Sequence, residues 1–108
     1  MVDEMRMAEK ISKCITIRDS NKKFHVNYRT SFLYGTINGA KSLGIDHITG
    51  SLEVGKSFDA VIADIGHATE PEFVDGDTAE ELLERFLHVG TPESVRSVFV
   101  AGKQVIKK

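Results

Sequence analysis

Four histidines and a single cysteine are the side chains in this sequence best suited to hold a metal ion. They are His25, His47, His67, His88 and Cys14. Two imidazoles that bind one metal from a single strand or helix are normally spaced as HxH or HxxxH. Consecutive histidines here are 22, 20 and 21 residues apart. A lone thiol can form neither a CxxC site nor an internal disulfide. The spacing therefore predicts no metal-ligating residue in this chain.

These side chains have simpler structural roles. We expect each histidine to be exposed or to cap an element. His88 falls in the last turn of a predicted helix, where an imidazole interacts favourably with the helix dipole. Cys14 is expected to be a small packed residue of a protein in a reducing compartment.

Acidic side chains are the next candidates, as general acids or bases or as calcium ligands. They are Glu80, Glu81, Glu84, Asp59, Asp64, Asp75 and Asp77. The three glutamates lie along a predicted helix and supply its polar face. The first two aspartates border a predicted strand, where turn-capping or solvation is the usual role. The last two flank Gly76, but the twelve-residue pattern of a calcium loop does not follow. We therefore expect no catalytic residue among them.

Other catalytic and cofactor motifs are also missing. The sequence contains neither a GxSxG nucleophile elbow nor a Walker loop. The glycine-rich stretch 35–39 falls inside a predicted helix rather than after a strand, so it is a poor phosphate cradle. A single cysteine excludes the HxE…PCxxC type of zinc deaminase. The residues alone thus predict no catalytic, cofactor-binding or metal site.

The composition and charge of the chain disfavour some classes of binding partner. The 108 residues carry a formal net charge of −2, which disfavours nucleic acid, because phosphate binding needs a concentrated basic surface. The sequence has no apolar run of about 18 residues that could span a membrane. The opening residues 1–6 include two acids and resemble neither a secretory signal nor a transit peptide. We expect a cytoplasmic protein without a nucleic-acid or membrane partner.

The first half is predicted to be helical. Apolar residues recur every three or four positions over residues 1–17, which predicts one helix. They are Met1, Met5, Ala8, Ile11 and Ile15. This helix has no capping residue before it, which suggests that its true start lies upstream. A polar connection is expected over residues 18–27.

A second helix is predicted over residues 28–43. Asn27 is a plausible N-cap for it, and Gly44 is a natural residue just past its end. Gly35, Gly39 and Ala40 leave one flank of this helix nearly bare. We expect another part of the protein to pack closely there.

The second half is predicted to be mostly strands. Residues 51–54 and 58–64 read as strands around a Gly55-Lys56 turn, followed by an acidic loop at 65–77. A helix is predicted from near Thr78 to about 89, capped either by Asp77 with Glu80 or by Thr78 with Glu81. Residues 94–100 and 103–107 read as a β-hairpin around Ala101-Gly102. So few short strands cannot close a barrel or sandwich, so the sheet is expected to continue elsewhere.

Three stretches resemble motifs of the metal-dependent amidohydrolase superfamily. Residues 50–62 are similar to its G-x-[IFL]-E-x-G-K-x-[AF]-D segment, and residues 98–105 to its closing V-x-V-x-G-K-x-V hairpin. Residues 35–44 are similar to its A-T-x-x-G-A-x-x-L-G helix, with Gly35 for the usual alanine.

Within the superfamily, the resemblance is to the guanine deaminases. Phe58-Asp59 stands where most relatives carry Ala-Asp, and residues 86–98 resemble the segment F-L-x-x-G…I-x-x-V. The opening residues 1–8 look like the helix that follows the last barrel strand. A departure is Ser94, where these enzymes tend to carry asparagine.

This resemblance implies an α/β fold that is incomplete by itself. Residues 1–44 would be the last helices of a (β/α)8 hydrolase barrel. Residues 45–108 would be the C-terminal part of its small β-sandwich, with a helix inserted at about 78–89. In the superfamily an HxH pair, two further histidines and an aspartate hold the metal, and all lie in the barrel upstream. None can be carried onto a residue of this chain.

For the whole enzyme, the resemblance implies zinc-activated water that converts guanine to xanthine and releases ammonia. It also implies a cytoplasmic homodimer, and it predicts that the present chain alone is inactive. Two other readings stay open. The chain could be the tail of an amidohydrolase for another cyclic amidine or amide, or a self-standing, non-catalytic module that binds a partner.

Overall fold

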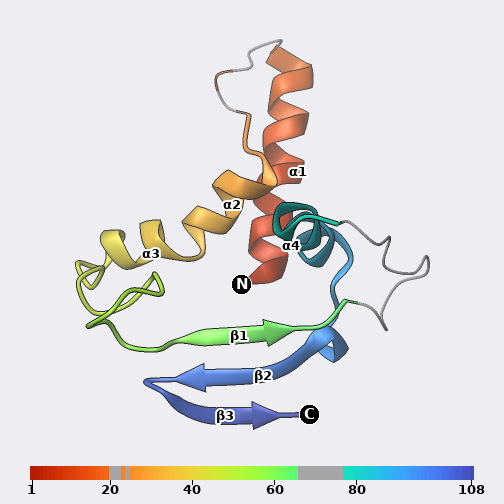
Figure 1. Ribbon diagram of the computed structural model, residues 1–108. Coiled ribbons are helices and arrows are strands. Elements are labelled where there is room, and N and C mark those ends of the chain that lie inside the picture. The colour runs from red at the N-terminus through yellow and green to blue at the C-terminus, as the bar shows by residue number, and fades with distance from the viewer. Residues whose placement is uncertain (20–22, 24, 66–76) are drawn as a thin grey trace.

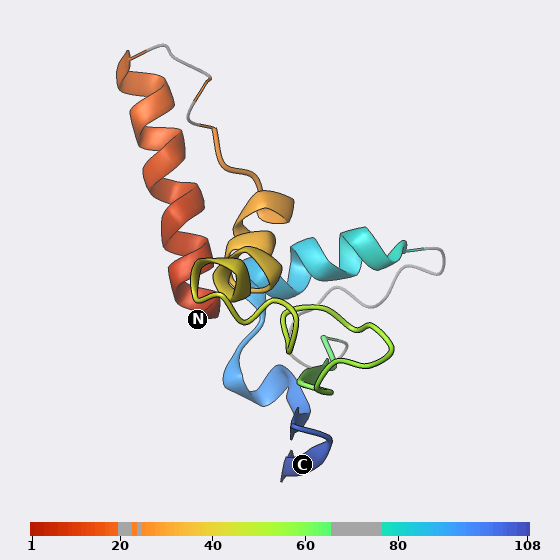
Figure 2. The ribbon, with the colours of Figure 1, turned by 90° about the vertical axis from the view of Figure 1, so that its left-hand side faces the viewer.

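The computed structural model describes residues 1–19, 23, 25–65 and 77–108, which form a group of helices and a three-stranded antiparallel sheet. The strands follow the order β1-β2-β3. Both ribbon views place the helices beyond the β1 edge of the sheet, and neither view shows a helix covering a face of it (Figures 1 and 2). This mixture of helices and strands confirms the α/β part of the predicted fold class. Among the described helices, none is long and apolar enough to cross a membrane.

Helix α1 spans Val2–Asp19, so the helix predicted over residues 1–17 is confirmed. The apolar stripe that predicts this helix is only partly buried in the chain. The buried side chains of α1 are Met5, Glu9 and Ser12, which lie four and three residues apart, whereas Ile11 is half exposed. Helices α2 and α4 therefore pack against a mostly polar face of α1.

The single helix predicted over residues 28–43 is wrong, because the chain forms two helices there. Helix α2 spans Tyr28–Tyr34 and helix α3 spans Ile37–Ser42. Between them Thr36 has φ −125° and ψ −109°, outside the helical region, so the helix axis changes direction. Asn27 caps α2 as predicted, accepting a hydrogen bond of 2.9 Å from the amide of Thr30.

The end of α3 follows the predicted glycine signal. Gly44 has φ +71°, and its amide donates to the carbonyl of Lys41 at 3.0 Å. The next amide, that of Ile45, donates to the carbonyl of Ala40, also at 3.0 Å. These two bonds make a Schellman motif, which satisfies carbonyls that the helix end leaves free.

The bare flank is packed closely, as predicted. A Cβ built on Gly35 would lie 1.9 Å from Met5 Cε of α1. Ala40 is buried, and a Cβ on Gly50 would lie 2.7 Å from its Cβ and 3.2 Å from the Cα of Ile37. The small residues thus allow α1 to pack closely against the end of α2, and the loop after α3 to pack closely against α3.

The strand predicted at residues 51–54 is wrong, because these residues are irregular: Ser51 is in a bend, and Val54 begins a turn. Strand β1 spans Ala60–Ala63, within the predicted 58–64. Strands β2, Val95–Val100, and β3, Lys103–Lys107, form the predicted hairpin. A 3-10 turn, Pro92–Ser94, leads into β2.

Helix α4 spans Ala79–Val89 and confirms the helix predicted from near Thr78 to about 89. Of the two capping boxes considered, the structure has Thr78 with Glu81: the Thr78 hydroxyl accepts from the Glu81 amide, and the Glu81 carboxylate accepts from the Thr78 amide. Gly90 ends the helix. Leu87 of α4 is 1 % exposed, the most completely enclosed apolar side chain among the described residues.

Much apolar surface is uncovered. Val61 and Ile62 are neighbours on β1, so their side chains point to opposite faces of the sheet, and both are more than half exposed. Val105 and Ile106 are likewise neighbours on β3, and both are exposed, at 53 % and 43 %. The described residues therefore leave both faces of the sheet without a covering layer.

Candidate functional site

The described histidines do not converge. His25 and His47 are exposed outside the helices and strands, and His88 is exposed at the end of α4. His67 lies outside the described residues. Within the described part of the chain, no group of three or more histidine, cysteine, aspartate or glutamate side chains is placed to hold a metal ion. Cys14 is exposed, so the expectation that it is packed is wrong.

The aspartates beside β1 have structural partners. Asp59 accepts from the amide of Ala101 at 2.7 Å and from the hydroxyl of Thr49 at 2.6 Å, so the turn-capping role is confirmed. The hydrogen bond from the Ala101 amide is the main cause that lowers the pKa of Asp59. Asp64 pairs with Arg96 of β2 at 2.9 Å.

The candidate acids of α4 are also accounted for. Glu81 belongs to the capping box, and the hydrogen bond from the Thr78 backbone is the main cause that lowers its pKa. Glu80 pairs with Arg29 of α2. Asp77 lies 2.9 Å from Arg85, and Asp75 is outside the described residues.

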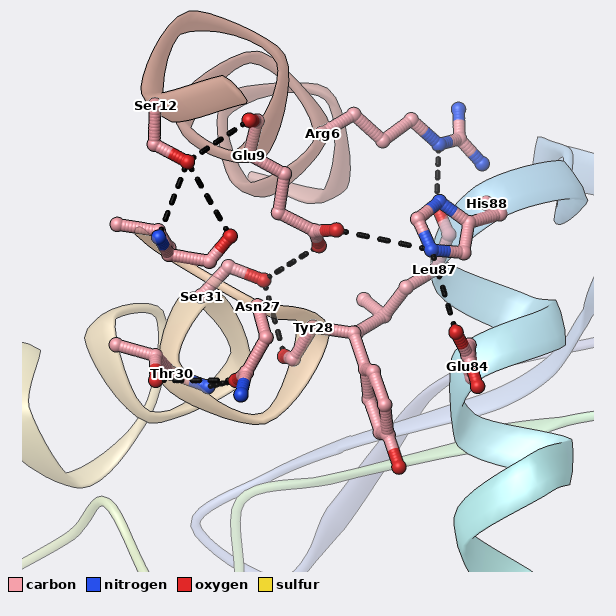
Figure 3. A network of polar contacts seen from close by, with 11 residues as sticks. Arg6, Glu9, Ser12, Asn27, Tyr28, Thr30, Ser31, Glu84, Leu87 and His88 are labelled. Atoms are coloured by element: carbon pink, nitrogen blue, oxygen red, sulfur yellow. Dashed lines mark hydrogen bonds and ion pairs between the residues drawn. The ribbon is translucent and has the colours of Figure 1, made fainter. Parts of the chain in front are cut away.

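Three of the four buried polar side chains in the described part of the chain lie in one cluster that the sequence did not single out. Glu9 of α1 is 3 % exposed and lies between α2 and α4 (Figure 3). Its Oε1 accepts a hydrogen bond of 2.8 Å from the hydroxyl of Ser31, which is fully buried on α2. Its Oε2 lies 3.6 Å from Nε2 of His88 on α4. One carboxylate therefore contacts both helices that pack against α1.

Ser12, one turn after Glu9 on α1, binds the segment that precedes α2. Its hydroxyl donates to the carbonyl of Glu9 at 2.9 Å and accepts from the amide of Val26 at 3.0 Å (Figure 3). The segment that leads into α2 is thereby held against α1. A buried hydroxyl needs such partners, because an unpaired polar group in the interior is costly.

Arg6 joins α1 to the end of α4. Its guanidinium donates to the backbone carbonyls of Leu87 and Gly90, and it also pairs with Asp3 at 3.0 Å. The last carbonyls of a helix have no partner inside the helix and carry its negative dipole end. A cation is therefore well placed here, and it fixes the C-terminal end of α4 against α1.

This cluster contains a carboxylate, a hydroxyl and an imidazole, yet its arrangement is unsuited to nucleophilic catalysis. The hydroxyl of Ser31 is directed to the carboxylate of Glu9 rather than to the imidazole, and it is closed to solvent. A nucleophile needs a base within hydrogen-bond reach and access to a substrate. The cluster is therefore a structural junction of three helices, and we call Glu9, Ser31 and His88 the helix junction.

Sequence reasoning could not have found the helix junction from spacing. Glu9 and Ser31 are 22 residues apart, and His88 belongs to a helix much later in the chain. The one available signal is that Glu9 lies on the same side of α1 as Met5 and Ser12. From the sequence alone, Glu9 looks like a solvated residue, because the helices that cover it are not known.

The chain matches the model of the amidohydrolase family over residues 1–105. It is 33% identical to the guanine deaminase of Mus musculus over 112 aligned residues, which cover 98% of this chain and 24% of that protein. The chain thus spans about a quarter of the length of this relative.

Two solved structures have a fold similar to that of this chain. A guanine deaminase from Bradyrhizobium japonicum superposes with a TM-score of 0.81 at 22% identity, covering 99% of this chain and 28% of that one. An adenosine deaminase from Xanthomonas campestris with bound zinc gives 0.71 at 23% identity, covering 97% and 22%. With a family match over nearly all its residues, this chain belongs to the amidohydrolase family.

Proposed function

We propose that this chain is the closing part of a guanine deaminase-like amidohydrolase. The intact enzyme would hydrolyse guanine to xanthine and ammonia. The observation that carries this proposal is the similarity to a guanine deaminase along 98% of the chain, although the chain spans only about a quarter of that relative. Residues 1–44 would supply the last barrel helices. Residues 45–108 would complete the small β-sandwich, with α4 as the inserted helix.

The uncovered apolar surface supports this assignment. Met7 and Ile17 of α1 are more than half exposed, as are Val61 and Ile62 of β1. Large exposed apolar areas mark surfaces that normally bind another part of a protein. In the proposed enzyme the remaining strands and barrel helices would cover these side chains.

Zinc in the proposed enzyme would be held by residues outside this chain. The described side chains do not fit a zinc site, because no three of the usual ligand types lie together. Zinc normally needs three or four such ligands at about 2.0–2.3 Å. In the proposed enzyme the residues of this chain would therefore take no direct part in the hydrolysis. A cytoplasmic location and a homodimer are further parts of the proposal, inferred from the family resemblance.

A direct test uses the purified 108-residue chain with zinc and guanine. We expect neither xanthine nor ammonia above background, and equilibrium dialysis should find no stoichiometric zinc at micromolar concentrations. Turnover or tight zinc binding would contradict the proposal.

A chimera tests the positive half of the proposal. In it, this chain replaces the matching segment of the Mus musculus guanine deaminase. We expect the chimera to deaminate guanine, whereas the same enzyme without the segment should be inactive. A chimera that folds, binds zinc and leaves guanine unchanged would count against a guanine deaminase origin.

A second candidate is a related deaminase with another purine substrate. The fold similarity to the adenosine deaminase from Xanthomonas campestris favours including it. The two candidates would differ in pocket residues outside this chain, so the coding sequence upstream of Met1 would distinguish them. We expect an in-frame metal-binding HxH segment there for either candidate. For the guanine deaminase-like candidate, we also expect pocket residues that match guanine deaminases.

A further inference from the structure

We propose that Asn38 and Gly39 form a site of spontaneous covalent modification, at which the chain converts Asn38 to aspartate and isoaspartate and releases ammonia. We call this pair the Asn38–Gly39 site. It lies in the first turn of α3, next to the end of α2 (Figure 1). The site lies wholly within the described residues and is independent of the proposed deaminase function.

The reaction uses only the backbone, one side chain and water. The amide nitrogen of Gly39 gives up its proton to water and attacks Cγ of Asn38, which forms a cyclic succinimide. The bond from Cγ to Nδ2 breaks, and the side-chain amide leaves as ammonia. Water then opens the ring at Cγ to give aspartate, or at the backbone carbonyl to give isoaspartate. The net change is uptake of water and loss of ammonia.

The attacking nitrogen is free of hydrogen bonds. The amides in the first turn of a helix have no acceptor inside the helix, and the first amide of α3 with a backbone acceptor is that of Ala40, which donates to Thr36 at 3.0 Å. The hydroxyl of Thr36 donates to the carbonyl of Phe32 at 2.8 Å and does not cap α3. Among the described residues, none accepts the Gly39 amide proton. The attack therefore breaks no hydrogen bond at this nitrogen.

The side chain under attack is equally free. Asn38 is half-buried, and within the described part of the chain its side-chain amide makes no hydrogen bond. Asn27 differs, because its Oδ1 accepts from the amide and the hydroxyl of Thr30 at 2.9 and 3.1 Å. The residue after Asn27 is Tyr28, whose side chain hinders approach to its own nitrogen. Asn27 is therefore an internal control for Asn38.

The helix gives the site little protection. Helical backbone angles keep Cγ of an asparagine away from the next amide nitrogen, so the first turn of α3 must open before attack. This opening breaks the bond from Ala40 to Thr36 and the bond of 2.9 Å from the Ser42 hydroxyl to the carbonyl of Asn38. Helix α3 has only six residues, and helices this short are marginal by themselves. The ends of such elements open at little cost in free energy.

Close packing explains why glycine follows Asn38. A Cβ on Gly39 would lie 2.9 Å from the backbone oxygen of Tyr34, the last residue of α2. A backbone oxygen cannot swing away as a flexible side chain can, so a larger residue would push α2 and α3 apart. Glycine also leaves its nitrogen unhindered, since it has no Cβ. The residue that the packing requires is thus the one that makes Asn38 reactive.

The isoaspartate product should disturb the packing of α3. It adds a methylene group to the backbone between Ile37 and Ala40. Both residues contact the loop after α3, where a Cβ on Gly50 would lie 2.7 Å from Cβ of Ala40 and 3.2 Å from Cα of Ile37. The longer backbone changes the spacing between these two contacts, so the loop should loosen. Aspartate at the same position leaves the backbone unchanged and should keep both contacts.

Ageing of the purified 108-residue chain tests the site. The folded chain and a synthetic peptide of residues 33–44 are incubated in the same mildly alkaline buffer, and peptide mass spectrometry follows the conversion of Asn38. We expect the folded chain to react at most about tenfold more slowly than the peptide, because the ends of short helices open readily. A greater slowing would show that α3 protects the pair and would overturn the inference.

Two comparisons identify the reacting residue. Asn38→Gln should stop the reaction, because the longer side chain closes a larger ring far more slowly. Asn27 should remain unmodified in the folded chain over the same period. Conversion of Asn27 at the rate of Asn38 would contradict the assignment, since it would mean that neither the free amide nor the following glycine matters.

The structural consequence has its own measurement. Treatment of the aged chain with an isoaspartyl methyltransferase and its methyl donor returns isoaspartate to aspartate through the same succinimide. We expect the aged chain to have a lower melting temperature than the fresh chain, and the treatment to restore most of the loss. Asn38→Asp carries the new charge on an unaltered backbone and should melt close to the wild type. An aged chain whose melting temperature is unchanged would refute the predicted loosening of the loop.

Discussion

The carboxylate of Asp59 accepts a hydrogen bond of 2.7 Å from the backbone amide of Ala101, in the turn between β2 and β3. The carbonyl of Phe58 accepts another, of 2.9 Å, from the amide of Gly102. The start of β1 thus holds the turn of a hairpin that lies some forty residues later. The sheet and the loop before it are coupled through this single carboxylate, since Thr49 also donates to it at 2.6 Å.

Replacing Asp59 should loosen the hairpin. In Asp59→Ala the amide of Ala101 loses its acceptor, so we expect a lower melting temperature and faster exchange of the turn amides. Asp59→Asn keeps an acceptor oxygen without the charge, so its melting temperature should lie between those of Asp59→Ala and the wild type. If Asp59→Ala has the same melting temperature as the wild type, the carboxylate does not hold the turn.

The contribution of Asp59 should also depend on pH. Its pKa is lowered in the folded chain, mainly by the Ala101 amide, so the stabilisation is present at neutral pH. It should be lost as the pH falls through the lowered pKa, below about pH 4. The melting temperatures of wild type and Asp59→Asn should therefore differ less at pH 3 than at pH 7. A constant difference between the two would show that the charge is irrelevant.

The two turn residues should respond in opposite directions to substitution. Ala101 has φ +49° and Gly102 has φ +77°, both in the left-handed region that costs a side chain about 1 kcal/mol. Ala101→Gly removes that strain, partly offset by the greater freedom of glycine in the unfolded chain, so a gain of about 0.5 kcal/mol is expected. Gly102→Ala should lose about 1 kcal/mol. Urea unfolding of both variants checks the contrast, and equal shifts would contradict it.

Local signals in the sequence predicted the ends of the elements well. Asn27, Gly44, Thr78 and Gly90 each act through hydrogen bonds that span only a few residues, so their types and positions suffice. The break at Thr36 was missed because a helix pattern continues across it. Its conformation depends on how α2 and α3 pack against separate parts of the chain.

Longer-range features could not be predicted in this way. The apolar stripe of α1 has the right period, but which face is buried depends on the helices beside it. They cover Met5, Glu9 and Ser12, whereas Ile11 of the stripe stays half exposed. The segment at residues 51–54 has strand-like composition but forms no strand here. Periodicity describes what a segment could bury, whereas the partner decides what it does bury.

Two glycines near helix ends should differ in their tolerance of a methyl group. A Cβ on Gly90 would lie 2.4 Å from the backbone oxygen of Phe86, which cannot move without disturbing α4. A Cβ on Gly35 would meet Met5 Cε, the flexible end of a side chain. We expect Gly90→Ala to lose about 2 kcal/mol of unfolding free energy and Gly35→Ala clearly less. Chemical denaturation of the matched pair measures this, and the reverse order would contradict the packing.

Removing the cap of α4 should release the start of that helix while its C-terminal end stays docked. The hydroxyl of Thr78 accepts from the amide of Glu81, and its replacement by alanine typically costs about 1 kcal/mol. We expect Thr78→Ala to raise exchange in the first turn of α4, whereas Thr78→Ser should behave like the wild type. Protection near His88 should change little, because Arg6 and Glu9 hold that end independently. Uniform loss of protection along α4 would show instead that the helix opens as one unit, controlled from its N-terminus.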